Sequence, residues 1–328
     1  MEKVMSGKRY VYILVFLIGV LITGIIVKLL QESDKDTEGN DYTEITESYE
    51  DDFDVTDYVG IDITDETMKD NDSSDFYYVE EDNSEEEVVE DLSDVPTVKK
   101  LLTAALEPVG TTLYVYGGGW NEEDTAAGVE ALSYGVSPRW KEFFDENNAS
   151  YNYQNTLYQI HDGLDCTGYV GYTVYQLFGD TYSDIGYVFK SKDMVSEYAG
   201  MFDSTFISRY DIDRYYPGDI MGKSGHVFMV IGECNDGSLL FLQASPPVVS
   251  LCGTPAPSGN NNSEAVGLAR EYMSKFYPES YARYDSCIRD TTFLTNYDQM
   301  HWNRNILSDP DGYDNMTPEE ILKDLFPE

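Results

Sequence analysis

A long acidic segment divides this 328-residue chain into parts with very different capacity to fold. Between Gln31 and Pro96 there are 27 Asp or Glu residues against 2 Lys, and almost no aliphatic run that could form a core. With so little apolar surface to bury, the entropy cost of ordering this segment dominates. We therefore expect residues 31–96 to be a disordered acidic linker. Residues 97–328 then form the folded domain, and about 230 residues suffice for one well-buried core.

The chain begins with a candidate membrane anchor. An almost purely apolar stretch runs from Tyr10 to Val27, and the next three residues extend it to the length of a membrane span. Basic residues precede this stretch and the acidic linker follows it, which places the N-terminus in the cytoplasm. A cleaved signal peptide is the alternative, although no small-x-small cleavage pattern follows. We expect residues 1–30 to be a cytoplasmic N-terminus and transmembrane anchor. The protein would then be single-pass in the cell membrane, with its domain extracellular, on the cell-wall side.

Charge and cysteine content narrow the function classes. The net charge is −40, of which −18 lies from Thr97 onward, so a nucleic-acid partner is not expected. There is no HExxH, paired CxxC or His/Asp cluster, and we expect neither a metal nor another cofactor. Four cysteines are widely spaced. If Cys166 is a free nucleophile, one disulfide at most can form, and its pairing among Cys234, Cys252 and Cys287 stays open.

Local patterns predict an α+β domain with helices packed on a central antiparallel sheet. Apolar spacing, capping residues and Gly or Pro stops predict helices over 98–106, 139–146, 166–178 and 264–276, and a capping box starts a last helix at Thr317 that runs to Phe326. Short apolar runs predict strands over 219–221, 226–233, 238–244 and 282–288. The Asn235-Asp236-Gly237 turn makes the second and third of these strands a hairpin.

Cys166 lies at the predicted start of a helix. Unpaired backbone N–H groups and the helix dipole favour an anion there, so we expect a thiolate. The same N–H groups can stabilise the oxyanion of an acyl-transfer intermediate. The alternative is that Cys166 is only a small apolar residue of a core helix.

Five ordered elements between Tyr114 and Ala244 carry a family resemblance. They are Tyr114-Val115-Tyr116-Gly117-Gly118, Asp165-Cys166-Thr167-Gly168-Tyr169, Pro217-Gly218-Asp219, Gly225-His226-Val227-Phe228-Met229-Val230, and the polar Gln243 on the following strand. In this order they resemble the motifs of the NlpC/P60 superfamily of cysteine peptidases. Tyr116 stands where that family has Trp, Phe228 where it has Gly, and Gln243 where it more often has His.

The resemblance implies a papain-like fold with Cys166 as nucleophile, His226 as general base and Gln243 orienting the imidazole. His226 begins one strand and Gln243 lies near the end of its hairpin partner, so the two side chains can meet across the ladder. The family pattern also assigns substrate binding to Tyr114, Asp165 and Thr167. From the residues alone, Tyr114 can equally be a core aromatic and Asp165 a helix cap.

The implied activity is hydrolysis of peptidoglycan stem peptides, at the bond between D-glutamate and the following diamino acid, through an acyl-enzyme. Peptidoglycan peptides and, through the N-terminal helix, the membrane are then the expected partners. A CHAP-like N-acetylmuramoyl-L-alanine amidase shares the Cys-then-His order and is one alternative. A catalytically inactive wall-binding or scaffold module is the other.

Overall fold

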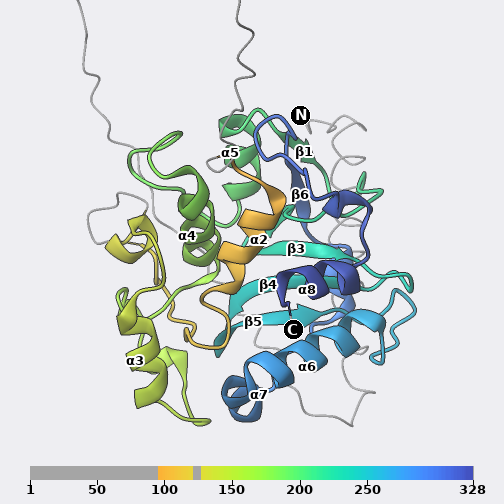
Figure 1. Ribbon diagram of the computed structural model, residues 1–328. Helices are drawn as coiled ribbons and strands as arrows, with labels where there is room; N and C mark the ends of the chain where they lie inside the picture. Colours follow the sequence, from red (N-terminus) through yellow and green to blue (C-terminus); the bar gives the residue numbers. More distant parts are fainter. Residues whose placement is uncertain (1–94, 121–126, 328) are drawn as a thin grey trace, which may run out of the picture. The chain divides into compact units, whose positions relative to one another are not determined.

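The computed structural model describes residues 95–120 and 127–327 (Figure 1). The expected membrane anchor and the expected acidic linker as far as residue 94 lie outside these residues. Across the two described ranges, no helix combines the length and apolarity needed to cross a bilayer.

Within the described residues, six strands form one antiparallel sheet in the order β1-β6-β2-β3-β4-β5. A two-residue turn joins β2 to β3, with Lys223 opposite His226, and Gly225 supplies the left-handed conformation at φ +90°. The predicted hairpin of β3 and β4 is confirmed. The strands are β1 (Thr205–Ile207), β2 (Ile220–Lys223), β3 (His226–Glu233), β4 (Leu239–Ser245), β5 (Val248–Gly253) and β6 (Asp298–His301).

The α+β class is confirmed, and several helices begin and end where local signals place them. Thr97 caps α2 by accepting from the N–H of Lys100 at 3.1 Å, and Thr317 and Glu320 form the predicted capping box. The helices are α2 (Val98–Leu106), α3 (Pro138–Glu146), α4 (Cys166–Phe178), α5 (Met194–Met201), α6 (Glu264–Phe276), α7 (Pro278–Tyr284) and α8 (Pro318–Leu325). The short 3₁₀ helices are η2 (Val129–Leu132), η3 (Tyr153–Asn155), η4 (Thr291–Leu294) and η5 (Tyr313–Asn315).

The predicted strand over 282–288 is wrong. Pro278 stands at the first helical position and starts α7, which continues to Tyr284 and ends at Asp285 in the left-handed conformation. Only Ile288 makes a β-bridge, to Gly253. Strands β1, β5 and β6 and helix α5 were not predicted.

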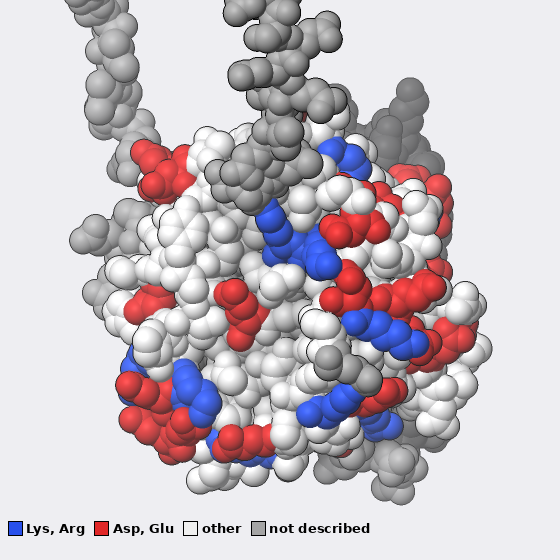
Figure 2. Space-filling model, viewed as in Figure 1, with Lys and Arg blue, Asp and Glu red and all other residues white. Residues whose placement is uncertain are grey.

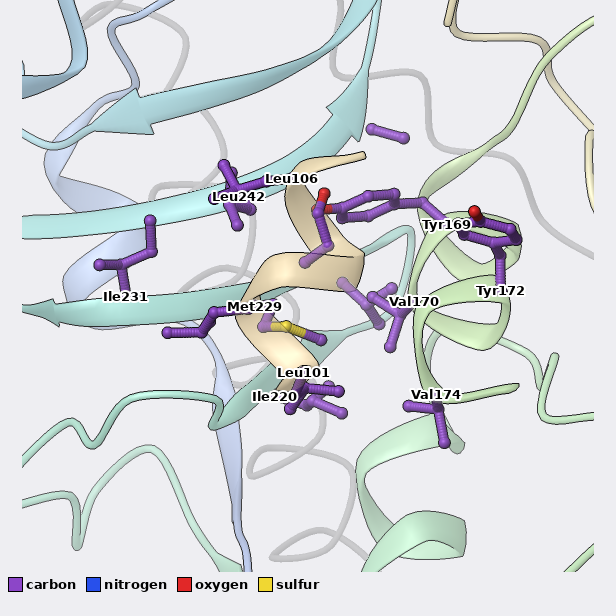
Figure 3. Close-up of a cluster of buried hydrophobic side chains, with 14 of the residues drawn as sticks. Leu101, Leu106, Tyr169, Val170, Tyr172, Val174, Ile220, Met229, Ile231 and Leu242 are labelled. Atoms are coloured by element: carbon purple, nitrogen blue, oxygen red, sulfur yellow. The ribbon is translucent and has the colours of Figure 1, made fainter. Parts of the chain in front are cut away.

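The main core lies between the helices and one face of the sheet. Helices α2, α4, α6 and α8 lie on the same side of the sheet (Figure 1), and each contributes residues to this cluster. Figure 3 shows Leu101 of α2 and Val170 of α4 packed toward Met229 and Leu242 of the central strands. The buried hydroxyl of Tyr169 donates to the Ala105 carbonyl at 2.8 Å, so this contact leaves no unpaired donor.

The opposite face of the sheet is also buried. Because side chains alternate along a strand, Val227 and Met229 enter the main core while Phe228 and Val230 enter a second cluster with Phe241. Tyr297, which precedes β6, belongs to this second cluster, and Phe293 of the 3₁₀ helix over 291–294 packs against it. His226 is in phase with Phe228 and therefore belongs to the second face.

Candidate active site

The first turn of α4 fixes Cys166 beside a capping carboxylate. Asp165 is the N-cap, and its carboxylate accepts from the N–H of Gly168 at 2.7 Å and from the N–H of Gly117 at 3.2 Å. Cys166 itself is only 7% exposed. Asp165 therefore has the capping role that its position allows, and it also ties the helix start to the glycine-rich loop.

Glycines allow that loop to cross α4 at backbone contact. The N–H of Asp165 donates to the Gly118 carbonyl at 3.0 Å. A Cβ added at Gly168 would collide with this same carbonyl group, and one at Gly119 would collide with the Gly168 backbone. Gly119 also has φ +96°, which favours glycine. The glycines of the two motifs thus meet each other and set the position of the Cys166 turn.

Thr167 and Tyr114 lie beside the candidate nucleophile. The Thr167 hydroxyl donates to Asp165 at 2.9 Å and accepts from Trp120 Nε1 at 3.0 Å, so both of its roles are used within the protein. Tyr114 is 9% exposed and packs edge-on against Tyr153. Burial raises the pKa of its phenol, and the nearby Cys166 and Asp165 raise it further. Tyr114 is therefore a core aromatic that also borders the site.

Thr167→Val should lower the free energy of unfolding by about 2 kcal/mol, because it leaves the Trp120 Nε1–H without its acceptor at nearly unchanged volume. Urea denaturation measures the loss. Thr167→Ser keeps the hydroxyl and should retain most of the stability. Equal destabilisation by Val and Ser would show that the methyl group, not the hydroxyl, matters at this position.

His226 and Gln243 are brought together as expected. His226 Nε2 lies 2.7 Å from the Gln243 amide, and the imidazole ring packs near Phe293 and Tyr297, with ring centroids 5.8 and 6.2 Å away. Gln243 is fully buried and His226 is half-buried. The pair is thus fixed on the second face of the sheet, at the start of β3.

Arg289 completes this cluster, and the sequence carried no motif that pointed to it. The Gln243 amide oxygen accepts from Arg289 Nε at 2.6 Å and from Nη2 at 2.9 Å, and the amide nitrogen then donates to His226 Nε2 at 2.7 Å. This orientation follows from the neighbours, since a guanidinium only donates. His226, Gln243 and Arg289 form one hydrogen-bonded chain.

Cys166 belongs to the main core and His226 lies on the second face of the sheet, and the two residues come near each other at the first residues of β3. The backbone N–H of Val227, the residue after His226, interacts with the Cys166 sulfur. Among the residues that the structure describes, no hydrogen bond joins the Cys166 thiol to the His226 imidazole. The structure therefore places Cys166 next to the strand that begins with His226 but shows no contact through which a proton could pass between the two side chains.

The Cys166 thiol and the His226 imidazole are both neutral in this structure. Burial raises the pKa of the Cys166 thiol to about 12, and the Asp165 carboxylate adds to this rise, which outweighs the lowering by backbone N–H groups. The prediction of a thiolate is therefore wrong for this structure, because burial raises the thiol pKa more than the N–H groups at the helix end lower it. Burial lowers the pKa of His226 to about 4. The nearby positive charges of Arg289 and Lys223 reinforce this shift.

The other cysteines and histidines serve different contacts. All four cysteines are free and buried. His161 pairs with Glu130 and His301 with the buried Asp219, each at 2.9 Å. In the described part of the chain, no three His, Cys, Asp or Glu side chains gather as metal ligands would.

No family model, curated protein or solved structure matches the chain. The resemblance to NlpC/P60 peptidases therefore rests on the five motif elements of the sequence alone.

Proposed function

We propose that the protein is a membrane-anchored extracellular cysteine endopeptidase of the NlpC/P60 type with a papain-like fold. One observation carries the proposal: a cysteine at the N-terminus of a buried helix borders the strand whose first residue is a histidine bonded to a buried glutamine. Cys166 is the nucleophile, His226 the general base and Gln243 the residue that positions the imidazole.

Because the Cys166 thiol and the His226 imidazole are both neutral at rest, the thiol proton must be transferred during the attack. His226 takes the thiol proton as the Cys166 sulfur attacks the scissile carbonyl, and the carbon–nitrogen bond breaks as the proton passes to the leaving amine. Water then hydrolyses the thioester, which releases the acid and restores the thiol. The backbone N–H groups of Cys166 and Thr167 interact with the thiol and lie at the helix end, where donors can stabilise the oxyanion.

The proposed substrate is the stem peptide of peptidoglycan, cut between D-glutamate and the diamino acid. Support comes from the motif resemblance and from the apolar N-terminal stretch with its acidic linker, which would hold the domain near the cell wall. On the face in Figure 2, Asp and Glu side chains are interspersed with Lys and Arg, and the basic side chains do not form a continuous surface. This charge distribution supports a partner other than nucleic acid.

The test is digestion of purified peptidoglycan sacculi by the full chain, with mass spectrometry of the products. An endopeptidase releases fragments with a new amino terminus on the diamino acid. A CHAP-like amidase instead separates the peptide from the sugar at L-alanine. Products of the second kind would reassign the bond.

A non-catalytic wall-binding or scaffold module is the second candidate. It is favoured by the missing hydrogen bond between Cys166 and His226 and by the amide donor on His226 Nε2. Such a module would sediment with sacculi without releasing soluble peptides, and Cys166→Ala would bind equally well.

The acid limb of the kcat/KM profile should lie near pH 4 instead of the ordinary histidine range. The free enzyme needs neutral His226, whose pKa is lowered to about 4 by burial with Arg289 and Lys223 nearby. The value of kcat/KM should therefore stay constant as the pH is lowered past 6, and it should fall only when His226 becomes protonated. Initial rates on a soluble stem peptide between pH 3.5 and 8 measure the limb. An acid limb near pH 6.5 would contradict the depressed pKa.

A further inference from the structure

The guanidinium of Arg289 is fixed independently of Gln243. Its Nη1 donates to the carbonyls of Ser286 and Ile288 at 3.0 and 2.8 Å, and its backbone N–H donates to the Gly253 carbonyl at 3.1 Å. These bonds hold the segment after α7 against β5. The remaining donors, Nε and Nη2, both face Gln243.

A fixed pair of donors dictates how the Gln243 amide lies. The amide atom that faces Arg289 lies 2.6 Å from Nε and 2.9 Å from Nη2, and it must be the oxygen because both guanidinium nitrogens donate. Turning the amide over would set its NH₂ against two N–H donors. Gln243 is fully buried, so water cannot compensate for the lost bonds.

The amide orientation in turn decides where His226 carries its proton. Gln243 donates to Nε2, so this nitrogen is the acceptor, and in the neutral imidazole the proton lies on Nδ1. We infer that Arg289, acting through Gln243, is a positioning residue that holds His226 in the Nδ1–H tautomer.

For the proposed function, on which this consequence rests, the tautomer defines a resting state. Nε2 is bound to Gln243, so Nδ1 is the nitrogen left to take the thiol proton, and in this tautomer it has no free lone pair. Catalysis needs the opposite arrangement, in which the amide oxygen accepts from Nε2–H. Weakening the hold of Arg289 should therefore favour the reactive tautomer.

Imidazole ¹⁵N spectroscopy on the full chain tests the tautomer without any assay of activity. The chain has three histidines, so ¹⁵N-histidine labelling gives three rings, and His161→Gln and His301→Gln assign the other two. At pH 7 the wild-type His226 should show protonated Nδ1 and unprotonated Nε2. Protonated Nε2 in the wild type would overturn the inference.

Two variants should exchange the protonated nitrogen. Gln243→Glu replaces the amide by an acceptor-only carboxylate, which can bind Arg289 with one oxygen and His226 Nε2–H with the other. Arg289→Met removes the donors that fix the amide. Arg270→Met is the matched control, because Arg270 and Arg289 both lie within electrostatic reach of Cys287 but only Arg289 bonds Gln243. An Nδ1–H tautomer retained in Gln243→Glu, or in folded Arg289→Met, would contradict the inference.

Rates on sacculi separate the inference from the proposed function. Arg289→Met should release muropeptides faster than Arg270→Met, about tenfold if the hold on the tautomer is worth about 1.4 kcal/mol. A tautomer exchange with an unchanged or lower rate would overturn the link to catalysis. A wild-type chain that releases no peptide would overturn the proposed function and leave the tautomer assignment standing.

Discussion

For the proposed peptidase, Cys166→Ala is expected to lower the rate of muropeptide release by about 10⁴-fold or more, because the proposed acyl-enzyme cannot form without the sulfur nucleophile. The variant should remain folded, since alanine suits the first turn of α4 and the Asp165 cap is untouched. Soluble peptides released from sacculi by the full chain, quantified by mass spectrometry, measure the rate.

Cys234→Ala is the matched control for this experiment. Cys234 is also a buried thiol whose pKa burial raises to about 12, but it follows the far end of β3 and its backbone N–H bonds Ser238. Its removal should leave the rate within about twofold, as expected for a site outside the chemistry. Undiminished release by Cys166→Ala would refute the cysteine peptidase mechanism.

Gly168→Ala is expected to lower the free energy of unfolding by about 3 kcal/mol or more, the upper range for overpacking a rigid contact. The added Cβ meets the carbonyl group of Gly118 and the Cα of Gly119, so backbone opposes backbone and no flexible side chain can yield. Relief requires the loop or the first turn of α4 to move. Because that turn carries Cys166, activity should fall as well as stability.

Gly267→Ala provides the comparison for this substitution. Gly267 lies in α6 on an exposed position, and a Cβ there meets nothing within 4 Å. Alanine should therefore stabilise the chain by up to about 1 kcal/mol through helix propensity. Urea denaturation of both variants measures the difference. Equal unfolding midpoints for Gly168→Ala and the wild type would show that the loop can shift freely.

For elements with strong local signals, the sequence predicts the first and last residues correctly. Helices α2, α4 and α6 have both observed bounds as predicted, because a capping side chain begins each helix and apolar spacing fills it. The β3–β4 hairpin was equally accessible, since its turn and its apolar strands are adjacent in the chain. Local hydrogen bonding is sufficient to specify such elements.

Elements that depend on distant partners could not be predicted. Strands β1 and β6 are short and pair with each other across more than ninety residues. Non-local pairing overrides weak local preference in such strands. The error over 282–288 has a local cause: Pro278 starts helix α7, which extends to Tyr284 and so takes the first three residues of the predicted strand.

The same division holds for the candidate site. That Cys166 begins a helix, that His226 begins a strand and that Gln243 lies within reach of His226 could be predicted, since caps, turns and strand periodicity are local properties. The chemical state of these residues could not, because it depends on tertiary packing. Burial keeps the thiol and the imidazole neutral, and Arg289, brought from a remote segment, fixes the amide that binds the imidazole. Protonation depends on solvent exclusion and on neighbouring charges, which exist only after distant segments have packed together.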